Sequence, residues 1–283
     1  MSDDIVIRNM TRGEVDLLIE WAALEGWNPG VHDAELFWNT DSDAFVAAEL
    51  GGDLIGGGAI TSYGGEFGFM GFFIVRPEYR GKGLGDRLWH ARCERLVERL
   101  KPGASIGMDG VFNMQDYYAK GGFKFSHRDI RYEYEGPAPI AEEGTMDSIA
   151  PLSDVSLEKL NAYDRACFPA PRTGFLSHWI AQPNALSLAC LRQGVLSGYG
   201  VIRTCREGFK IGPLFADDDN AATALFAGLA QFGSPGPIYL DVPENNPAAV
   251  ALAKRYQMKE VFGCARMYLG QFPEVAHERL CGV

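Results

Sequence analysis

Residues 80–86 read Arg-Gly-Lys-Gly-Leu-Gly-Asp, which places three glycines and two cations in one short segment. An apolar run that predicts a strand precedes the segment, and a pattern typical of a helix follows it. Glycines let successive backbone N–H groups converge on one point, and a helix N-terminus adds about half a positive charge. Arg80 and Lys82 add full charges. The segment therefore predicts a cradle for a pyrophosphate group.

Two other glycine-rich motifs fit this segment less well. The dinucleotide-binding motif G-x-G-x-x-G follows an early first strand, whereas Gly81, Gly83 and Gly85 form G-x-G-x-G after several predicted strands. In a P-loop the lysine is followed by Ser or Thr, but Lys82 is followed by Gly83. We therefore set both interpretations aside.

The pattern Arg80-x-x-Gly83-x-Gly85 resembles motif A of the GCN5-related N-acetyltransferases (GNAT). Downstream, residues 118–123 read Tyr-Ala-Lys-Gly-Gly-Phe and resemble the Tyr-x-x-x-Gly-Phe segment of that family. Together, with a helix and a strand predicted between them, the two motifs are more specific than either alone. The resemblance covers residues 1 to about 135. Other pieces resemble the subgroup with a second GNAT-like domain, namely 26–30, Arg203, 212–214, 241–243 and 266–268.

The resemblance implies an acyltransferase whose donor is acyl-CoA, most simply acetyl-CoA. The backbone of Phe73, Ile74 and Val75 would pair with the pantetheine arm as an added strand does. Tyr118 would protonate the departing CoA thiolate; its alternative role is a core aromatic on a short helix. Asn113 lies five residues before Tyr118, whereas many family members carry an Asn seven residues before it. The expected cofactor-binding residues are Phe73, Ile74, Val75, Arg80, Gly81, Lys82, Gly83, Leu84, Gly85, Asp86, Asn113 and Tyr118.

The segment between Arg12 and Arg76 contains no Lys or Arg but eleven Asp and Glu residues. In the family this segment walls the acceptor pocket, so we expect a small cationic acceptor, most simply a primary amine. The alternative is a solvated surface whose charge bias has no function. Trp27 and Glu25 are the candidate acceptor-binding residues, and plain packing is the alternative for Trp27.

An amine acceptor must lose a proton before it can attack a thioester. With a pKa of about 10.4, deprotonation at pH 7 costs roughly 4–5 kcal/mol. Glu66, at the start of the motif strand, and Asp109, on the next predicted strand, are the candidate general bases. We expect no metal site, because the histidines and cysteines show no ligand spacing.

The elements that must position these residues repeat a strand–helix order in each half of the 283-residue chain. This order predicts an α/β fold of the α+β type. We expect two tandem GNAT-like domains, each a mixed, mostly antiparallel twisted sheet flanked by helices. The catalytic domain would span 1–136, a Pro- and Gly-containing linker 137–151, and a second domain 152–283.

The second half lacks the residues that carry the predicted chemistry. Where the first half has its glycine turn, residues 216–220 read Ala-Asp-Asp-Asp-Asn, and an acidic turn repels pyrophosphate. Ala253 stands at the position that corresponds to Tyr118. We therefore expect a degenerate copy without a cofactor site, which supports the fold or covers the acceptor site.

Composition limits the remaining functional classes. A net charge of −11 argues against binding of nucleic acid or anionic membranes, because phosphate contacts need clustered Lys and Arg. No apolar run approaches the ~18 residues of a membrane span, and the acidic N-terminus has no leader pattern. We expect a cytoplasmic protein, a monomer or a homodimer. The alternative function is a non-catalytic acyl-CoA-binding regulatory protein, which would keep the cradle but not need Tyr118.

Overall fold

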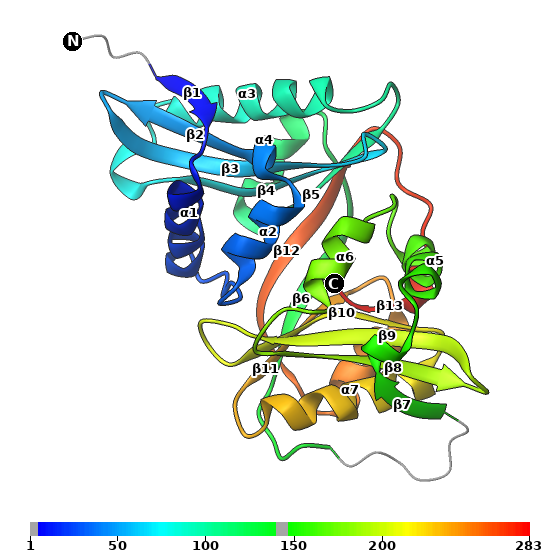
Figure 1. The fold of residues 1–283 in the computed structure, drawn as a ribbon. Helices are drawn as coiled ribbons and strands as arrows, with labels where there is room; N and C mark the ends of the chain where they lie inside the picture. The colour runs from blue at the N-terminus through cyan, green and yellow to red at the C-terminus, as the bar shows by residue number, and fades with distance from the viewer. Residues whose placement is uncertain (1–4, 140–146) are drawn as a thin grey trace.

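The computed structural model describes residues 5–139 and 147–283, so the central part of the predicted linker lies outside the described residues. One mixed sheet runs through the molecule in the order β1-β2-β3-β4-β5-β12-β6-β11-β10-β9-β8-β7, and β13 pairs with β10. Figure 1 shows the first half at the top, the second half at the bottom, and β12 running between them. Within the described residues, no helix is long and apolar enough to cross a membrane.

The first half begins with a short strand and two helices and ends with the long strand β6. Its strands are β1 (Val6–Asn9), β2 (Phe45–Leu50), β3 (Asp53–Tyr63), β4 (Phe67–Val75), β5 (Ser105–Val111) and β6 (Lys124–Tyr134). Its α-helices are α1 (Arg12–Leu24), α2 (Asp33–Thr40), α3 (Leu84–Glu98) and α4 (Gln115–Lys120), with a 3₁₀ turn η3 (Phe112–Met114) before α4.

The second half repeats this order. Its strands are β7 (Asp147–Pro151), β8 (Ala185–Arg192), β9 (Val195–Thr204), β10 (Phe209–Ala216), β11 (Ile238–Pro243), β12 (Lys259–Leu269) and β13 (Leu280–Gly282). Its α-helices are α5 (Leu157–Cys167), α6 (Thr173–Trp179), α7 (Asp219–Gly233) and α8 (Pro247–Arg255). Residues 147–151, which we predicted as linker, are strand β7 and pair with β8.

The two halves exchange their long strands β6 and β12. Strand β12 of the second half pairs antiparallel with β5 of the first, and β6 of the first half pairs antiparallel with β11 of the second. β6 and β12 also pair with each other, so the sheet is continuous across the boundary between the halves. The sequence analysis predicted a separate sheet in each half. Alternation of apolar and polar residues shows which face of a strand is buried but not which strand lies beside it, so the exchange could not be predicted from the pattern.

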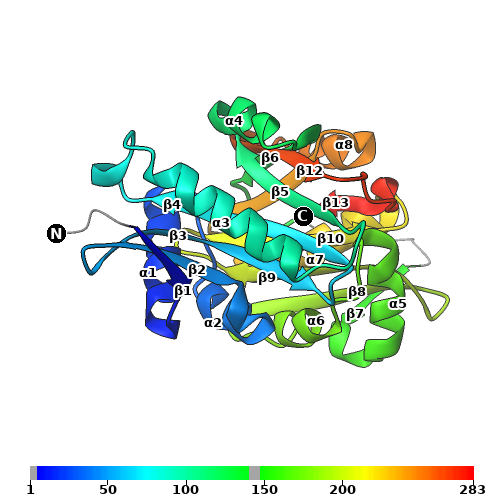
Figure 2. The ribbon, with the colours of Figure 1, turned by 90° about the horizontal axis from the view of Figure 1, so that it is seen from above.

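The predicted cofactor site lies where the backbones of β4 and β5 diverge, and this gap between the two strands is called the cleft below. These parallel strands pair only between Phe67–Met70 and Ser105–Met108. Beyond that point they separate; seen from above in Figure 2, β5 turns away from β4 toward α4. Among the described residues, no strand pairs with residues 72–75 of β4 on that side.

The corresponding cleft of the second half is occupied by the chain itself. Parallel strands β10 and β11 pair only from Phe209 to Ile211 before they separate. In the gap, β13 pairs with β10 at Leu214 and Phe215. A strand of the protein thus lies where the first half leaves an open edge.

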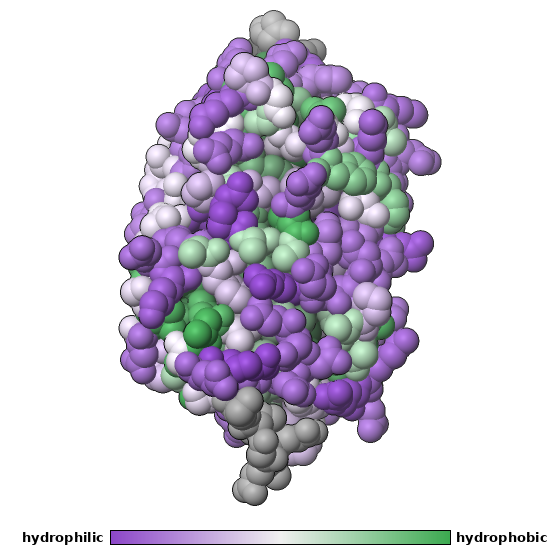
Figure 3. Space-filling view, turned by 90° about the vertical axis from the view of Figure 1, so that its right-hand side faces the viewer, coloured by the Kyte–Doolittle hydropathy of each residue, from purple (hydrophilic) through white to green (hydrophobic). Residues whose placement is uncertain are grey.

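Helices cover both faces of the sheet (Figure 1). In the first half α3 packs on one face, where Leu88, Trp89 and Leu96 are buried, and α1 and α2 lie on the other. Helix α2 meets α6 of the second half, and the rings of Phe37 and Trp179 stack there with centroids 5.9 Å apart. Among the described residues on the outer face seen in Figure 3, apolar side chains form only small patches between hydrophilic ones.

Candidate active site

The glycine turn before α3 forms the predicted anion cradle. Gly81 and Gly83 adopt φ values of 73° and 75°, in the left-handed region that favours glycine. Gly83 is the N-cap of α3 and provides no side-chain hydrogen bond to the first amides of the helix. A Cβ built at either glycine would meet nothing within 4 Å, so the space in front of the turn is open. These amides can therefore bind the oxygens of a phosphate group.

The two cations of the turn are placed differently. The Arg80 guanidinium donates to the Val75 carbonyl at 2.7 Å and forms an ion pair with Glu25 at the end of α1. The Lys82 ammonium donates to the Glu78 carbonyl at 2.9 Å and has no carboxylate partner among the described residues. Glu25, which we predicted at the acceptor, therefore ties α1 to the cofactor turn, while the charge of Lys82 remains available to an anion.

A β-bulge in β4 shapes the open edge beside the cradle. The register with β3 shifts between Gly57 and Ala59, and Phe72 adopts a left-handed φ of 51°. The ring of Phe72 packs toward Trp27 with centroids 6.3 Å apart, whereas Phe73 packs on Trp89 of α3 at 5.6 Å. The predicted pantetheine-binding segment is thus irregular and has its edge toward the cleft.

Arg92 of α3 lies under this bulge and was missed by sequence reasoning. Its side chain is fully buried, and one nitrogen donates to the carbonyls of Ala59 and Gly71 at 2.7 and 2.6 Å. The other two guanidinium nitrogens have no partner among the described residues. Burial lowers the pKa of Arg92 to about 10. The sequence signal that could have indicated a buried group here is Gly58. A Cβ at this position would lie 2.4 Å from the guanidinium carbon of Arg92, so only glycine leaves room for it.

Tyr118 of α4 is buried beside the place where β5 leaves β4. Its ring packs on Trp89 with centroids 5.0 Å apart, and a Cβ on Gly110 of β5 would lie 2.6 Å from that ring. Burial raises the pKa of Tyr118, and the nearby Arg92 opposes the rise. The phenol therefore keeps its proton at neutral pH, as a proton donor requires.

Tyr117 and Asn113 lie on or next to the helix that carries Tyr118. Tyr117, the neighbour of Tyr118, donates to Asp86 in the first turn of α3 at 2.6 Å. Asn113 is exposed on η3, between β5 and α4. The structure thus gathers the glycine turn, the β4 edge, Asn113 and Tyr118 around one cleft.

The two candidate bases lie at different places. Asp109 immediately precedes Gly110 on β5, and Arg266 of β12 donates to both of its oxygens at 2.5 and 3.0 Å. Although 31% of its side chain is exposed, desolvation by the surrounding protein raises the pKa of Asp109 in spite of Arg266, and the nearby Asp129 adds to the rise. Glu66 lies before the paired end of β4, about six strand residues or ~20 Å from the level of Gly110.

Glu66 therefore does not join the group around Tyr118. It is exposed and pairs with Lys101 at 3.4 Å. Asp109 is therefore the one candidate base beside Tyr118 that the sequence predicted.

Asp109, Asp129 and Cys264 form a cluster whose ligand atoms lie within 4.8 Å of one another. Arg266 forms ion pairs with both carboxylates, at 2.5 Å to Asp109 and 3.4 Å to Asp129. The guanidinium thus supplies the positive charge that a metal ion would bring. The absence of a metal remains a prediction.

A cavity of about 320 Å³ lies between the two halves. Aromatic rings from both halves line it: Phe37, Tyr63, Phe67 and Phe69 from the first, and Phe168, Phe175, Trp179, Phe215 and Tyr268 from the second. Arg266, the partner of Asp109, also lines it, which connects the cavity to the face of β5 that carries Asp109. The second half therefore forms part of the wall of this cavity; that it covers the acceptor site stays a prediction.

The acidic residues of the first half do not line this cavity. Eight of the eleven between Arg12 and Arg76 form ion pairs with arginines or a lysine, namely Glu14, Asp16, Glu20, Glu25, Asp33, Asp41, Glu49 and Glu66. The charged side chains that do line it are four cations, Arg172, Arg203, Lys210 and Arg266, and one side-chain carboxylate, Asp241. The acidic composition of the segment therefore no longer supports a cationic acceptor.

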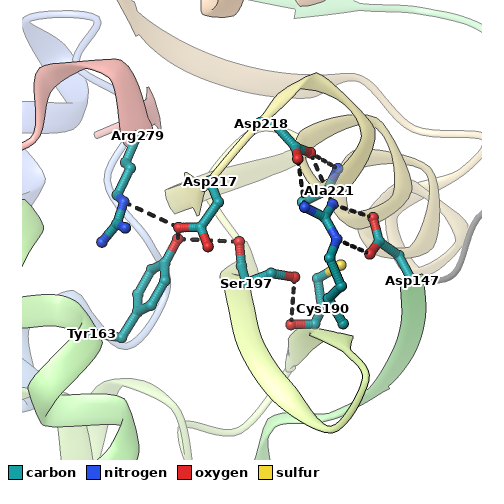
Figure 4. Close-up of polar contacts among 9 residues, drawn as sticks. Asp147, Tyr163, Cys190, Ser197, Asp217, Asp218, Ala221 and Arg279 are labelled. Atoms are coloured by element: carbon teal, nitrogen blue, oxygen red, sulfur yellow. Dashed lines mark hydrogen bonds and ion pairs between the residues drawn. The ribbon is translucent and has the colours of Figure 1, made fainter.

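The carboxylates of the acidic turn in the second half interact with neighbouring groups of the protein (Figure 4). Asp218 accepts a hydrogen bond from the Ala221 amide at 3.0 Å and thereby caps α7. Arg192 pairs with Asp218 at 2.7 Å, while Tyr163 donates to Asp217 at 2.9 Å. The carboxylates thus take the place that a phosphate would need at this helix.

Comparison with known proteins agrees with this geometry. A model described as the acetyltransferase (GNAT) family matches residues 14–123, and one described as an acetyltransferase (GNAT) domain matches residues 160–282. The expected tandem of two GNAT domains is thereby confirmed.

Relatives cover the chain in whole and in part. It is 26% identical over 266 residues to a holothin acyltransferase of Pseudoalteromonas sp. (strain SANK 73390), covering 92% of this chain and 86% of that protein. It is 33% identical over 112 residues to an acetyltransferase of Yersinia pestis (strain Pestoides F), covering 37% and 79%. The crystal structure of a putative acetyltransferase from Pyrococcus horikoshii shares the fold, with a TM-score of 0.84, 21% identity, and coverage of 100% and 95%. These relatives support an enzyme rather than a non-catalytic regulator.

Proposed function

Since this chain belongs to the GNAT family of acetyltransferases and carries two of its domains in tandem, we propose that it moves an acetyl group from acetyl-CoA directly to the primary amine of a small acceptor. One observation carries the proposal. The open edge of β4 leads from the uncapped N-terminus of α3 to Tyr118 and Asp109.

The donor would lie along the cleft between β4 and β5. The amides of the glycine turn, with Lys82 beside them, would bind the pyrophosphate. The backbone of Phe73, Ile74 and Val75 would hydrogen-bond the pantetheine amides as an added strand does. The thioester would then lie between the bulge and Gly110, within reach of Tyr118.

The reaction forms a C–N bond and breaks the C–S bond of the thioester. The amine must lose one proton, which we assign to Asp109, because a raised pKa suits a base that works near neutral pH. The departing CoA sulfur gains one proton, which we assign to Tyr118. That help is modest, since a thiol has a pKa of about 8.5 and tyrosine one of about 10.

The acceptor would occupy the cavity between the halves. Its aromatic wall favours a largely apolar molecule, and 320 Å³ is at the lower end of small-molecule sites.

The second half would bind no cofactor of its own. Strand β13 occupies its cleft, and Asp218 caps the helix that would receive the pyrophosphate. We therefore propose one acetyl-CoA per chain.

Calorimetry with CoA and an assay of CoA release test this proposal together. We expect one CoA per chain and release of CoA thiol when primary amines with an apolar body are added, with an amide product of one added acetyl mass. Two CoA molecules per chain would refute the single site. Release without amide formation would refute amine transfer.

A further inference from the structure

Lys210 of β10 is a buried cation that lines the cavity between the halves. Only 6% of its surface is exposed. Its ammonium makes one hydrogen bond among the described residues, to the carbonyl of Trp27 at 3.4 Å. No carboxylate of the described residues forms an ion pair with it; the carboxylate that acts on its charge most, Asp241, is paired with Arg131.

The neighbouring cations of the same face each have a carboxylate of their own. Arg203 of β9 pairs with Asp33 of α2 at 3.1 Å, and Arg131 of β6 pairs with Asp241 of β11 at 2.6 Å. Three cations thus share two carboxylates, and Lys210 carries the excess positive charge. Burial of an unpaired charge is costly, which is why burial lowers the pKa of Lys210 to about 8.

Trp27 connects this charge to the proposed reaction site. Its carbonyl accepts the hydrogen bond of Lys210, and its ring packs on Phe72 at the bulge of β4. On the cavity side, the stacked rings of Phe37 and Trp179 flank the same region. An acceptor in the cavity would therefore contact aromatic rings and the Lys210 ammonium, which has no ion-pair partner among the described residues.

We propose that Lys210 binds an anionic group of the acceptor, most simply a carboxylate, so that the substrate is an amino-carboxylate with an apolar or aromatic body. The inference rests on the proposed acetyl transfer to an amine and names its substrate class. A bound carboxylate would give Lys210 the ion-pair partner that Arg203 has in Asp33 and Arg131 has in Asp241. The amine of the same molecule would face the cleft that carries Asp109 and Tyr118.

Matched acceptor pairs test the inference. The probes are phenylalanine against phenethylamine and 4-(aminomethyl)benzoate against benzylamine, each with acetyl-CoA. For at least one pair we expect the carboxylate-bearing member to have a kcat/KM at least 10-fold higher than its partner. In Lys210→Met this preference should fall to near 1, through the KM of the acceptor, with the KM of acetyl-CoA unchanged. Lys254→Met, at an exposed position on α8, is the matched control and should keep the preference.

The outcomes separate the two proposals. If no primary amine in the panel is acetylated, the proposed function fails. If amines are acetylated with no preference for the carboxylate in either pair, the Lys210 inference fails and the proposed function stands.

A second measurement does not depend on the variant folding. In the wild-type protein, 3-phenylpropanoate should raise the melting temperature and 3-phenylpropanol should not. Equal shifts with the two compounds overturn the role of Lys210.

Discussion

Asp109 and Asp241 occupy equivalent positions in the two halves of the sheet. Asp109 on β5 lies opposite Arg266 on β12, and Asp241 on β11 lies opposite Arg131 on β6. In both cases the arginine belongs to an exchanged strand and donates to both carboxylate oxygens. Each ion pair therefore joins a strand of one half to the exchanged strand of the other. Asp109, however, lies beside an open cleft, and Asp241 lies beside the cleft that contains β13.

This equivalence allows a catalytic role of Asp109 to be separated from a structural one. Asp109→Asn should lower kcat about 10²-fold or more, because the base is lost. As a base, Asp109 must be deprotonated, so wild-type activity should rise with pH through its raised pKa, and this acidic limb should disappear in the variant. The measurement is kcat against pH with saturating substrates.

Asp241→Asn is the matched control for that experiment. It breaks the equivalent ion pair, which costs up to about 3 kcal/mol of unfolding free energy. Because Asp241 also lines the acceptor cavity, the KM of the acceptor should change, but kcat at saturating acceptor should stay within about 3-fold. Similar kcat values in the two variants would show that Asp109 is only structural.

Tyr118→Phe removes the proposed proton donor and little else from a packed site. We expect kcat to fall about 10²-fold with the KM of acetyl-CoA nearly unchanged, because the ring still fills the space beside Trp89. Tyr132→Phe, which removes a buried phenol that donates to Glu260 outside the cleft, should keep wild-type kcat. Equal activity of Tyr118→Phe and wild type contradicts the proton-donor role.

Gly83→Ala tests the anion cradle. Alanine is strained at a φ of 75° by roughly 1–2 kcal/mol, and its methyl group would project into the open space where a phosphate must approach. The dissociation constant of CoA, measured by calorimetry, should rise at least about 10-fold. Gly194→Ala carries similar strain at a φ of 78° in the β8–β9 turn and should not change it. If both variants bind CoA like the wild type, the cradle assignment is wrong.

Arg92→Met tests whether the buried guanidinium maintains the bulge of β4. The substitution leaves the carbonyls of Ala59 and Gly71 without their donor but also removes an unpaired buried charge, so stability should change by less than about 2 kcal/mol. We expect kcat/KM for acetyl-CoA to fall at least about 10-fold. Arg87→Met, on the same helix, should have little kinetic effect. Unchanged kinetics in Arg92→Met would restrict Arg92 to packing.

Lys210 predicts a pH-dependent contribution to stability. Its pKa falls from 10.5 in the unfolded chain to about 8, so between these values the unfolded state binds more protons and stability rises with pH. The groups that face it are Asp241, Arg131, Arg203 and Cys205. Relative to Lys210→Met, the wild type should gain up to about 3 kcal/mol of unfolding free energy from pH 8 to 10.5, measured by urea denaturation. A constant difference across this range contradicts the shift.

Local signals in the sequence predicted most elements correctly. The apolar run predicted as a strand before residues 80–86 is β4, and the helix predicted after them is α3. The cradle was predictable because glycine, cation and helix-start signals all lie within one short segment. Such features depend on neighbours in the chain.

The features that were missed depend on contacts between distant residues. β6 and β12 have similar lengths and patterns, so nothing local decides which of them lies beside β5. Arg92 and Lys210 read as ordinary surface cations, because only the assembled fold buries them. β13, a three-residue strand, is too short for a periodic pattern.

Strand exchange also determines when β5 acquires its second neighbour during synthesis. Roughly 150 residues separate the end of β5 from the start of β12, which at about 5–20 residues per second is a delay of roughly 10–30 s on the ribosome. Throughout that interval the edge of β5 that β12 will cover stays unpaired, and an unpaired edge is a template for pairing with another chain. The rate at which the second half is translated thus sets how long each nascent copy is exposed to association with its neighbours on the same messenger RNA.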